Sequence, residues 1–578
     1  MLILFFIAVC LLCVGVKSQE QVAPNVIVIL TDDQGFGDVE YNCLNGTSMC
    51  AEMPNLKKFA MSPHSAVFHR FYATAAVCSP TRAAVLTGRN NQRVCIADAL
   101  PCCNEDLAAE CAMGRKGSLP DSEFTFGDAA KKSDLGNYST VMLGKWHLGD
   151  LWDKKLPDMN SDFPVSAPWM FGFDKWLLTQ GEASSTQSNC GCFQVEHEHP
   201  GPRPRPTAYP VIPYGDQCVV AGGYPSDWCY NCTNYYYANS SDARNITELS
   251  YKIPGDDNQF ILDEFESFLA SRVVDDESSP QPFLAYLAMH SIHEPHPALP
   301  EYYSRYVTDP DYNGILYQFD VAFGRLMHIL DDANVTNDTV VIFTSDNGPH
   351  QGHERSDVHY STGFLRECKQ SIFEGGLRVP GIIFSPRLIN QNMNITTPVG
   401  SVDILPTIMD LLQVESNNPE FAMDGISLLP LIKEASEKAE KHVRLQLAAT
   451  EDNNDPVVGA GVPVESTSTP TVVSLERPSD TPLTFWFKES MAVVDNDWKL
   501  VYNPQPGQCL QQRPYILPST YMNKFFLFNI KDDMHELYDR KDEFPEIFAH
   551  LMSKLNEFKK SVEYSQQVEV GCTPYVEQ

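Results

Sequence analysis

Two pairs of adjacent oxygen-bearing side chains follow apolar runs in this chain. Asp32 and Asp33 come after one run, and Asp346 and Asn347 come after another. Carboxylate and amide oxygens are hard ligands of the kind that Ca²⁺ prefers. Either pair alone is also an ordinary turn or helix-cap sequence, because Asp and Asn side chains hydrogen-bond readily to nearby backbone groups. The pairs therefore indicate a metal site only if other residues point to the same chemistry.

The charge of the chain limits the partners that it can bind. Its formal net charge is −33 at pH 7. Nonspecific attraction to nucleic acid or to anionic lipid is disfavoured, since both are polyanions. An anionic substrate would also be repelled at long range. Any anion site in this chain must therefore be a local basic pocket.

One cysteine is followed by a proline two residues later and by an arginine four residues later. These are Cys78, Pro80 and Arg82. Three fixed positions alone are a weak signal, and a helix start with a buried or paired cysteine would explain them. The complete run from Val77 to Arg89, which ends in Leu-Thr-Gly-Arg, closely resembles the signature of the sulfatase family. In that family the pattern directs oxidation of the cysteine thiol to an aldehyde.

The resemblance implies that Cys78 is converted after translation to formylglycine (3-oxoalanine) by the formylglycine-generating enzyme. Hydrated formylglycine is a geminal diol, of which one hydroxyl would attack sulfur and expel the alcohol. Loss of a proton from the other hydroxyl would then restore the aldehyde and release sulfate from the formylglycine-sulfate intermediate. A serine could form the same ester but would need a separate, difficult hydrolysis. The implied reaction is hydrolysis of a sulfate ester by covalent catalysis.

The resemblance also implies one bound Ca²⁺. Both oxygen-bearing pairs match the family's metal ligands in type, order and placement. A cation at this position would lower the pKa of the diol. The expected ligands are Asp32, Asp33, Cys78, Asp346 and Asn347.

Positive groups are needed around the transferring sulfate. The run from Gly144 to Gly149 matches the family's Gly-Lys-Trp-His-Leu-Gly element. Lys145 would hold the diol or the sulfate, and His147 would accept the proton of the second hydroxyl. Arg82 of the signature belongs to the same implied pocket.

Two later segments complete the implied anion pocket. Ser291-Ile-His-Glu-Pro295 resembles the family's His-x-Pro element, so His293 would protonate or orient the leaving oxygen. Its neighbours His290 and His296 are weaker candidates.

The run from Cys368 to Arg378 resembles the family's element Lys-x-x-x-aromatic-Glu-Gly-Gly-x-Arg. Lys369 would reach the sulfate, while Glu374 and Arg378 would serve the structure of the loop. Any one of these basic residues alone is more often a solvated surface charge.

Short runs rich in valine and isoleucine must position these residues. Because the runs are apolar on both faces, they suit buried parallel strands with helices on each side. Amphipathic stretches at 259–270 and 317–330 predict such helices. Ligands of open α/β sheets lie at the carboxyl ends of the strands, where distant segments converge. The expected strands are 25–30, 140–144, 283–289, 339–344 and 380–385.

The fold class is predicted as α/β, and the resemblance implies an alkaline-phosphatase-like sandwich with a large mixed central sheet flanked by helices. A smaller C-terminal domain is expected to hold an antiparallel sheet, with strands at 491–494, 498–502 and 525–529, and a packing helix at 545–557. The predicted divisions are a signal peptide at 1–18, a catalytic domain at 19–435 with a Cys- and Pro-rich insertion at about 180–242, and a C-terminal subdomain at 436–578 with a connector at about 451–482.

The apolar run at residues 1–16 is too short for a comfortable membrane span and indicates secretion, with an uncleaved anchor as the alternative. Of the 17 cysteines, two lie in this run, and setting Cys78 aside leaves an even number for disulfides. The spacing of Cys190, Cys192, Cys229 and Cys232 could mimic a zinc site, although the usual repeated spacing is missing. Eight Asn-x-Ser/Thr triplets also favour a glycosylating secretory route, to the lysosome or the cell exterior.

The sequence leaves three functions open. The first is a sulfatase acting on an aryl sulfate or a sulfated carbohydrate. The second is a phosphoester or phosphonate hydrolase of the same superfamily, and the third is a catalytically silent binding protein with the same fold. Every expected catalytic position holds a competent residue, which favours the enzyme. The substrate, the oligomeric state and any further ligands from the insertion stay open.

Overall fold

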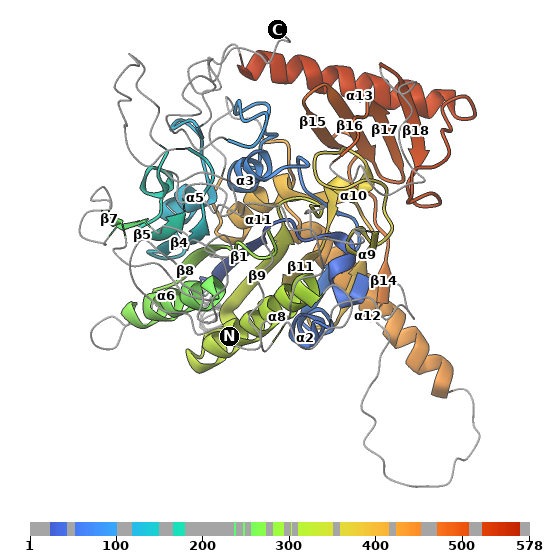
Figure 1. The fold of residues 1–578 in the computed structure, drawn as a ribbon. Helices are drawn as coiled ribbons and strands as arrows, with labels where there is room; N and C mark the ends of the chain where they lie inside the picture. Colours follow the sequence, from blue (N-terminus) through green and yellow to red (C-terminus); the bar gives the residue numbers. More distant parts are fainter. Residues whose placement is uncertain are drawn as a thin grey trace, which may run out of the picture.

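The central feature of the fold is an 11-stranded mixed sheet, shown in a computed structural model of the chain (Figure 1). The structure describes residues 23–42, 52–100, 118–149, 166–179, 236–238, 247–248, 256–272, 281–293, 302, 310–350, 359–415, 423–451, 471–507 and 523–566. The strands of this sheet are β1 (Asn25–Thr31), β2 (Ser65–Phe68), β4 (Ser139–Lys145), β5 (Lys175–Thr179), β6 (Tyr236–Ala238), β7 (Thr247–Glu248), β8 (Phe283–Ala288), β9 (Thr339–Ser345), β11 (Gly381–Phe384), β12 (Met393–Ile395) and β14 (Thr471–Val473).

The strand order is β14-β12-β2-β11-β9-β1-β8-β4-β5-β6-β7. β1 runs parallel to both of its neighbours, β8 and β9, and β4 runs parallel to β8 and β5. β11 is antiparallel to both β9 and β2, so the predicted mixed sheet is confirmed. The apolar run at 380–385 suits a parallel strand, but β11 is antiparallel to both neighbours. Burial on both faces gives the same apolar pattern in either direction, so the sequence does not show the direction of this strand.

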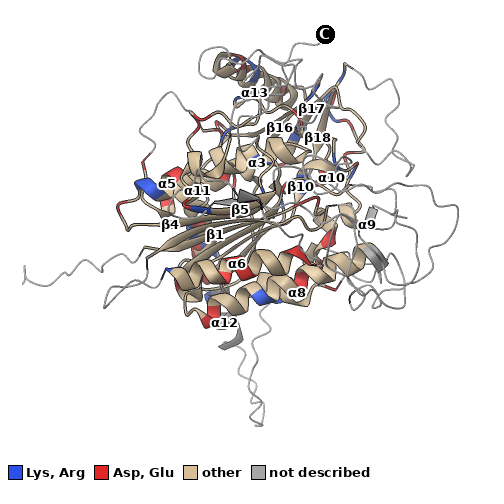
Figure 2. Cartoon of the chain, turned by 60° about the vertical axis from the view of Figure 1, so that its left-hand side comes forward, with Lys and Arg blue, Asp and Glu red and all other residues tan. Residues whose placement is uncertain are grey.

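Helices cover both faces of the sheet (Figure 2). Alternate residues of β1 point to opposite sides, as strand geometry requires, and each side has its own apolar core. The helices are α2 (Pro54–Ala60), α3 (Cys78–Thr87), α5 (Phe126–Lys132), α6 (Asp257–Ser271), α8 (Pro310–Asp332), α9 (His359–Thr362), α10 (Glu374–Leu377), α11 (Ile404–Leu411), α12 (Leu429–Glu451) and α13 (Pro545–Tyr564). One layer contains α6 and α8, and the other contains α3, α5 and α11.

Short elements complete the larger domain. A three-stranded sheet has the order β10-β3-β13, with β3 (Phe71–Tyr72) between β10 (Arg378–Val379) and β13 (Val399–Gly400). The 3-10 helices are η1 (Phe36–Asp38), η2 (Glu40–Asn42), η3 (Pro168–Phe171), η5 (Thr336–Asp338) and η6 (Ser401–Asp403).

The C-terminal part forms a separate antiparallel sheet of four strands. They are β15 (Leu483–Phe487), β16 (Ser490–Asp495), β17 (Trp498–Tyr502) and β18 (Phe525–Asn529). α13 packs on one face, where Leu551 and Leu555 contact Met491 and Leu500. The opposite face lies against the larger domain in an apolar cluster that includes Ile372 and Phe373. The predicted antiparallel sheet and packing helix are confirmed, and β15 is an additional strand.

Some predicted segments lie wholly or largely outside the described residues. These include the signal peptide and most of the 180–242 insertion and of the 451–482 connector. α12 continues across residues 435 and 436, the predicted division between the two domains. β14, which lies within the predicted connector, pairs with β12 at the edge of the large sheet. Among the cysteines in the described part of the chain, Cys78 is free, and Cys95 and Cys368 are disulfide-bonded. No helix among the described residues is both long and apolar enough to cross a membrane.

Candidate active site

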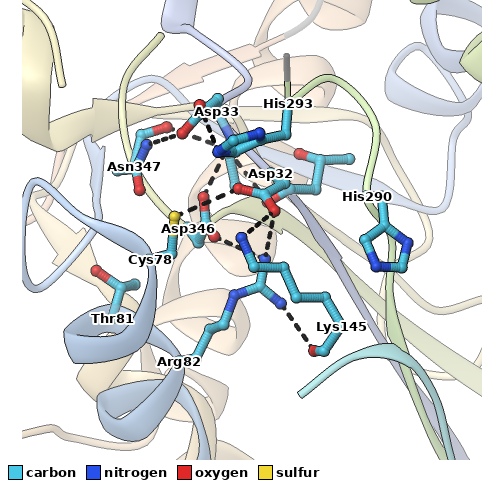
Figure 3. Close-up of polar contacts among 12 residues, drawn as sticks. Asp32, Asp33, Cys78, Thr81, Arg82, Lys145, His290, His293, Asp346 and Asn347 are labelled. Carbon is cyan, nitrogen blue, oxygen red and sulfur yellow. Dashed lines mark hydrogen bonds and ion pairs between the residues drawn. The ribbon is translucent and has the colours of Figure 1, made fainter. Parts of the chain in front are cut away.

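Four of the five predicted metal ligands, the two oxygen-bearing pairs, follow the carboxyl ends of two adjacent strands, β1 and β9. Their parallel register pairs Thr31 with Ser345, which places Asp32 beside Asp346. The backbone N–H of Asp33 donates to Asp346 Oδ1 at 3.1 Å. Asn347 Nδ2 donates to Asp33 Oδ1 at 2.6 Å. Two segments far apart in the sequence thus form one buried group of oxygen atoms (Figure 3).

Cys78 is the first residue of α3, and its side chain is fully buried. Pro80 lies in the first turn, where a missing N–H costs the helix nothing. Arg82 follows one turn after Cys78, and residues four apart share a helix face. This spacing explains why the motif delivers a sulfur atom and a guanidinium to the same place. Gly88 ends the helix in the left-handed region, with φ 64°, which glycine adopts readily.

Arg82 joins two of the carboxylates. Its Nη2 lies 2.7 Å from Asp346 Oδ2 and 3.3 Å from Asp32 Oδ2. Its Nη1 donates to the backbone carbonyl of Lys145 at 3.0 Å. The guanidinium therefore fixes the end of β4 relative to the oxygen-bearing pairs.

Two lysines approach the same carboxylates from different segments. Lys145, the last residue of β4, places Nζ 2.6 Å from Asp32 Oδ2. Lys369 Nζ lies 2.7 Å from Asp33 Oδ1 and 3.5 Å from Cys78 Sγ. Cys78 Sγ lies 3.5 Å from Asp32 Oδ1 as well. The sulfur atom is thus flanked by a carboxylate and an ammonium group.

The histidines separate into two groups. His293 Nε2 lies 3.5 Å from Asp33 Oδ2 and 3.4 Å from Lys369 Nζ, inside the cluster. His290 faces away from it, with Nδ1 2.8 Å from Asp257 Oδ2 and Nε2 2.7 Å from Thr179 Oγ1. The structure thus brings His293, and not His290, into contact with the cluster. His296 lies outside the described residues.

His147 lies next to the site rather than among the contacting charges described above. Its Nε2 is 2.9 Å from the backbone oxygen of Leu100. The N–H of Leu100 donates to Ser79 Oγ at 3.0 Å, directly beside Cys78 in sequence. The role of His147 as a proton acceptor stays a prediction.

The pKa values of the three carboxyl groups in the cluster are shifted in different directions. Burial would raise the pKa of Asp33, but Lys369 and His293 outweigh it and hold the pKa at about 2. Burial is likewise outweighed at Asp32, chiefly by Lys145, so its pKa is well below the ordinary value. At Asp346, burial together with the charge of Asp32 raises the pKa to about 7. A bound cation would favour ionised Asp346, because an opposite charge stabilises the carboxylate.

The residues present fit a metal ion. Ligand atoms of Asp32, Asp33, Cys78 and His293 all lie within 4.8 Å of one another. The buried Oδ1 of Asn347 has no hydrogen-bond partner among the described residues, which leaves an oxygen available as a ligand. Buried polar atoms are normally paired, and a cation at this position would be a partner for this oxygen.

Sequence reasoning missed Asp38, which supports the turn after Asp33. Its Oδ2 accepts from the N–H of Gly35 and from the hydroxyls of Tyr312 and Ser361, each at 2.6 Å. Asp33 itself has a left-handed φ of 59°, a conformation that the surroundings must stabilise in a non-glycine residue. No local pattern marks Asp38 as important, because two of its three partners, Tyr312 and Ser361, come from distant helices.

The fold and the site together define an α/β protein with a buried cysteine beside a cluster of carboxylates that fits a metal ion. The Sulfatase family profile matches residues 24–414 of this chain. The chain therefore belongs to the sulfatase family, and its enzyme class is sulfuric ester hydrolase.

Curated relatives are identical to the chain at about a quarter of the aligned positions. Steryl-sulfatase of Rattus norvegicus is 27% identical over 436 residues, covering 71% of this chain and 70% of the relative. Arylsulfatase A of Homo sapiens is 27% identical over 410 residues, covering 71% and 68%. N-acetylgalactosamine-6-sulfatase of Sus scrofa is 28% identical over 427 residues, covering 72% and 67%.

Solved structures share the fold. The PsFucS1 sulfatase from Pseudoalteromonas sp. has a TM-score of 0.61 and 18% identity, covering 95% of this chain and 92% of the other. The phosphonate monoester hydrolase of Agrobacterium radiobacter has a TM-score of 0.51 and 15% identity, covering 93% and 96%. At these identities the similarity shows the architecture alone.

Proposed function

We propose that this protein is a secreted, calcium-assisted sulfatase that acts through Cys78 after conversion of this residue to formylglycine. The observation that carries the proposal is the position of Cys78 Sγ, 3.5 Å from Asp32 Oδ1 and 3.5 Å from Lys369 Nζ. A nucleophile at this point has the metal-binding carboxylates on one side and a cation for the sulfate on the other. The match of the Val77–Arg89 run to the family signature supports the modification.

The unmodified thiol is a poor nucleophile in this environment. Burial raises the pKa of the Cys78 thiol well above its usual range, and the Asp32 carboxylate adds to the effect. The reactive thiolate is therefore disfavoured. Hydrated formylglycine would instead supply a geminal diol, with one hydroxyl to attack sulfur and a second whose deprotonation releases sulfate. The formylglycine-generating enzyme is the partner that this proposal requires during maturation.

The four oxygen-bearing side chains would hold one Ca²⁺ together with residue 78. Carboxylate and amide oxygens are the ligands that calcium prefers, and the cluster contains no soft ligand besides the sulfur atom of Cys78. The ion would supply a positive charge that lowers the pKa of the nucleophilic hydroxyl. The proposed ligands are Asp32, Asp33, Cys78, Asp346 and Asn347.

Three cationic side chains would bind and orient the sulfate group. Lys369 contacts both Cys78 and Asp33, so its ammonium is already positioned where negative charge would develop. Lys145 and Arg82 are fixed by carboxylates and approach from the side of β4 and α3. Cations held in advance need little reorganisation during the reaction, which is the main electrostatic source of rate enhancement.

Two histidines would move protons. His293 lies beside Lys369 and would protonate the oxygen of the departing alcohol. His147 lies near the start of α3 and would accept the proton of the second hydroxyl. A histidine is suited to both tasks because its ordinary pKa is close to neutral pH.

We propose an aryl or steryl sulfate or a sulfated carbohydrate as the substrate class. The named activities of the curated relatives, steryl-sulfatase, arylsulfatase A and N-acetylgalactosamine-6-sulfatase, support this range. The apolar run at residues 1–16 supports entry into the secretory pathway, with a lysosomal or extracellular destination.

The test begins with protein from a eukaryotic secretory host. Mass spectrometry of the peptide that carries Cys78 should show formylglycine, and the protein should cleave a chromogenic aryl sulfate in a calcium-dependent manner. Cys78→Ala is the control and should be inactive. Faster cleavage of a phosphonate or phosphate ester would favour the rival hydrolase. Unmodified Cys78 and no hydrolysis, from a host that modifies another sulfatase, would contradict the proposal.

A further inference from the structure

The loop that carries Lys369 has an unfavourable backbone. Phe364, Glu367 and Gln370 are non-glycine residues with φ of 64°, 60° and 71°. Left-handed conformations cost free energy in residues with a Cβ atom, so they persist only where surrounding contacts enforce them. The source of that enforcement determines where Lys369 Nζ lies.

Glu536, in the C-terminal domain after β18, holds both ends of this loop. Its Oε2 accepts from the backbone N–H of Glu374 at 2.7 Å, and its backbone oxygen accepts from Arg366 Nη1 at 2.6 Å. Within the loop, the N–H of Gly375 donates to the backbone oxygen of Arg366 at 2.7 Å. Lys369 lies between Arg366 and Glu374 in the sequence, so Glu536 clamps the segment on both sides of it.

Lys499 of β17 joins the two glutamates. Its Nζ lies 2.8 Å from Glu374 Oε1 and 2.9 Å from Glu536 Oε1, and all three side chains are fully buried. Tyr72 donates to Glu374 Oε2 at 2.9 Å, and Arg378 Nη1 lies 3.5 Å from the same oxygen. We call Tyr72, Glu374, Arg378, Lys499 and Glu536 the domain-boundary cluster.

A second C-terminal contact acts on the loop directly. The N–H of Gly507 donates to Glu367 Oε2 at 3.1 Å, and Ser371 Oγ donates to the backbone oxygen of Gln505 at 3.0 Å. These contacts lie on either side of Lys369 in sequence. The C-terminal domain therefore contacts the loop through more than one segment.

The loop transmits its position to the site through short backbone contacts. The N–H of Lys369 donates to the oxygen of Pro349 at 3.0 Å, and the N–H of Gly348 donates to the oxygen of Gly376 at 2.9 Å. A Cβ on Gly348 would lie 2.0 Å from the oxygen of Gly375, so the two turns touch without intervening side chains. A shift of the loop must therefore move Lys369 and disturb the turn after Asn347.

We propose that Lys499 and Glu536 are positioning residues for the reaction: they fix the strained loop and thereby hold Lys369 against the sulfate. This inference rests on the proposed function, because it assigns Lys369 to the sulfate. It gives the C-terminal domain an indirect part in catalysis, through the position of Lys369.

The first test compares substitutions by their kcat and KM for an aryl sulfate. Glu536→Ala removes the acceptor for the Glu374 N–H, and Lys499→Met leaves two buried glutamates without their shared cation. Each should lower kcat/KM about 10- to 100-fold, since a small misplacement of a catalytic group has effects of this order. Glu536→Gln keeps an acceptor and should restore most of the activity that Glu536→Ala loses.

Asp497→Asn is the matched control. Asp497 lies in the turn between β16 and β17 and bonds Arg70 across the same domain boundary at 2.9 Å. No contact links it to the Lys369 loop among the residues that the structure describes. Its kcat/KM should stay at the native value. Equal losses in Asp497→Asn and Glu536→Ala would mean a merely structural role and would overturn the proposal.

A double-mutant cycle separates action through Lys369 from a general weakening of the fold. In a Lys369→Met background, Lys499→Met should cause little further loss of kcat/KM, because the group that it positions is absent. A loss in the double mutant equal to the product of the two single-mutant losses would overturn the proposal. If Lys499→Met does not fold, the same cycle is run with Glu536→Ala.

Hydrogen exchange of residues 366–377 tests the positioning without any assay of activity. The amides should exchange faster in Glu536→Ala than in Asp497→Asn, and equal rates would overturn the proposal. A native protein without sulfatase activity would defeat the proposed function, while the exchange rates would still decide whether the C-terminal domain holds the loop.

Discussion

Two groups of buried charge differ in how completely they are satisfied. In the domain-boundary cluster, Lys499 contacts both glutamates, and the second oxygens of these glutamates accept from Tyr72 and from the backbone of Glu374. In the active-site cluster, Asn347 Oδ1 is unpaired and Cys78 is free among the described residues. The active-site cluster comprises Asp32, Asp33, Cys78, Arg82, Lys145, His293, Asp346, Asn347 and Lys369.

This difference separates charge that stabilises from charge that reacts. Buried charges are tolerated when every donor and acceptor is paired. A group with an unpaired acceptor and a free buried thiol can gain from binding a cation or an anion. A group whose charges already face one another gains less. Substitutions in the active-site cluster should therefore change activity more than stability. Substitutions in the domain-boundary cluster should change stability more than activity.

The largest expected effect is at Cys78. Cys78→Ala should lower kcat by roughly 10⁴-fold or more, as removal of a covalent nucleophile does in other enzymes. Unfolding by urea should change little by comparison. Cys78→Ser should attack once and stop, so mass spectrometry should find a serine that has gained one sulfate group. Full turnover by either variant would show that the active-site cluster, like the domain-boundary cluster, does not supply the reacting group.

Lys369→Met should have the next largest effect on the rate. Removal of one fixed positive group should lower kcat about 10²- to 10³-fold, the range found when a single electrostatic stabiliser is removed. Stability should fall less than in Lys499→Met, because His293 remains near Asp33. Steady-state kinetics and urea unfolding of the two variants, measured side by side with calcium present, provide the comparison. A larger loss of stability in Lys369→Met would contradict it.

Lys499→Met should mainly lower stability. Removing one partner of a fully buried ion pair typically costs about 3–5 kcal/mol, since an uncompensated charge is left behind. Urea unfolding at neutral pH measures this loss. Asp497→Asn, at a partly exposed pair of the same domain boundary, should cost less than about 1 kcal/mol. Equal losses of unfolding free energy in the two variants would mean that the buried pairing of Lys499 adds no more stability than the partly exposed pair at Asp497.

The last expected effect is a change in pH dependence. Burial raises the pKa of Glu536 from 4.5 to about 7, against the pull of Lys499 and with the help of Glu374. The folded state thus binds more protons than the unfolded state between these values. This group's contribution makes the free energy of unfolding fall as pH rises through the window, by at most about 1.4 kcal/mol per pH unit.

Glu536→Gln should remove that contribution and flatten the pH dependence between pH 4.5 and 7. The low pKa of Asp33, about 2, acts with the opposite sign, because its contribution is lost only as pH falls below its ordinary value of 3.8. Urea unfolding at several pH values, with calcium present, distinguishes the two. An unchanged slope in Glu536→Gln would show that this carboxyl does not titrate in that range.

Sequence patterns predicted the active-site cluster far better than the domain-boundary cluster. Cys78 and Arg82 share a helix face because of their spacing, and Asp32 and Asp346 share a sheet edge because parallel strands end together. Lys499 has no such local signal, since it lies between Trp498 and Leu500 in a strand where alternation suggests a solvent-facing position. Its partner Glu374 lies 125 residues away.

The fold shows the same limit. Apolar runs identified the buried strands, including β1, β8 and β9, because strand burial is a local property of sequence. They did not reveal the direction of β11 or the existence of β15. The left-handed residues that shape the Lys369 loop also lacked a signal, because Phe364, Glu367 and Gln370 are not glycines. Long-range contacts enforce these features, and such contacts cannot be seen in a single sequence.

The enclosure of α3 has a consequence for the order of events during biosynthesis. Every residue of the helix is buried, so a modifying enzyme has no access to Cys78 once the chain has folded. Asp346 and Lys369 are also synthesised long after Cys78. Under the proposed function, the thiol would therefore be oxidised before the chain folds around it. Purified modifying enzyme should convert a denatured unmodified chain and leave the folded one unchanged, as peptide mass would show.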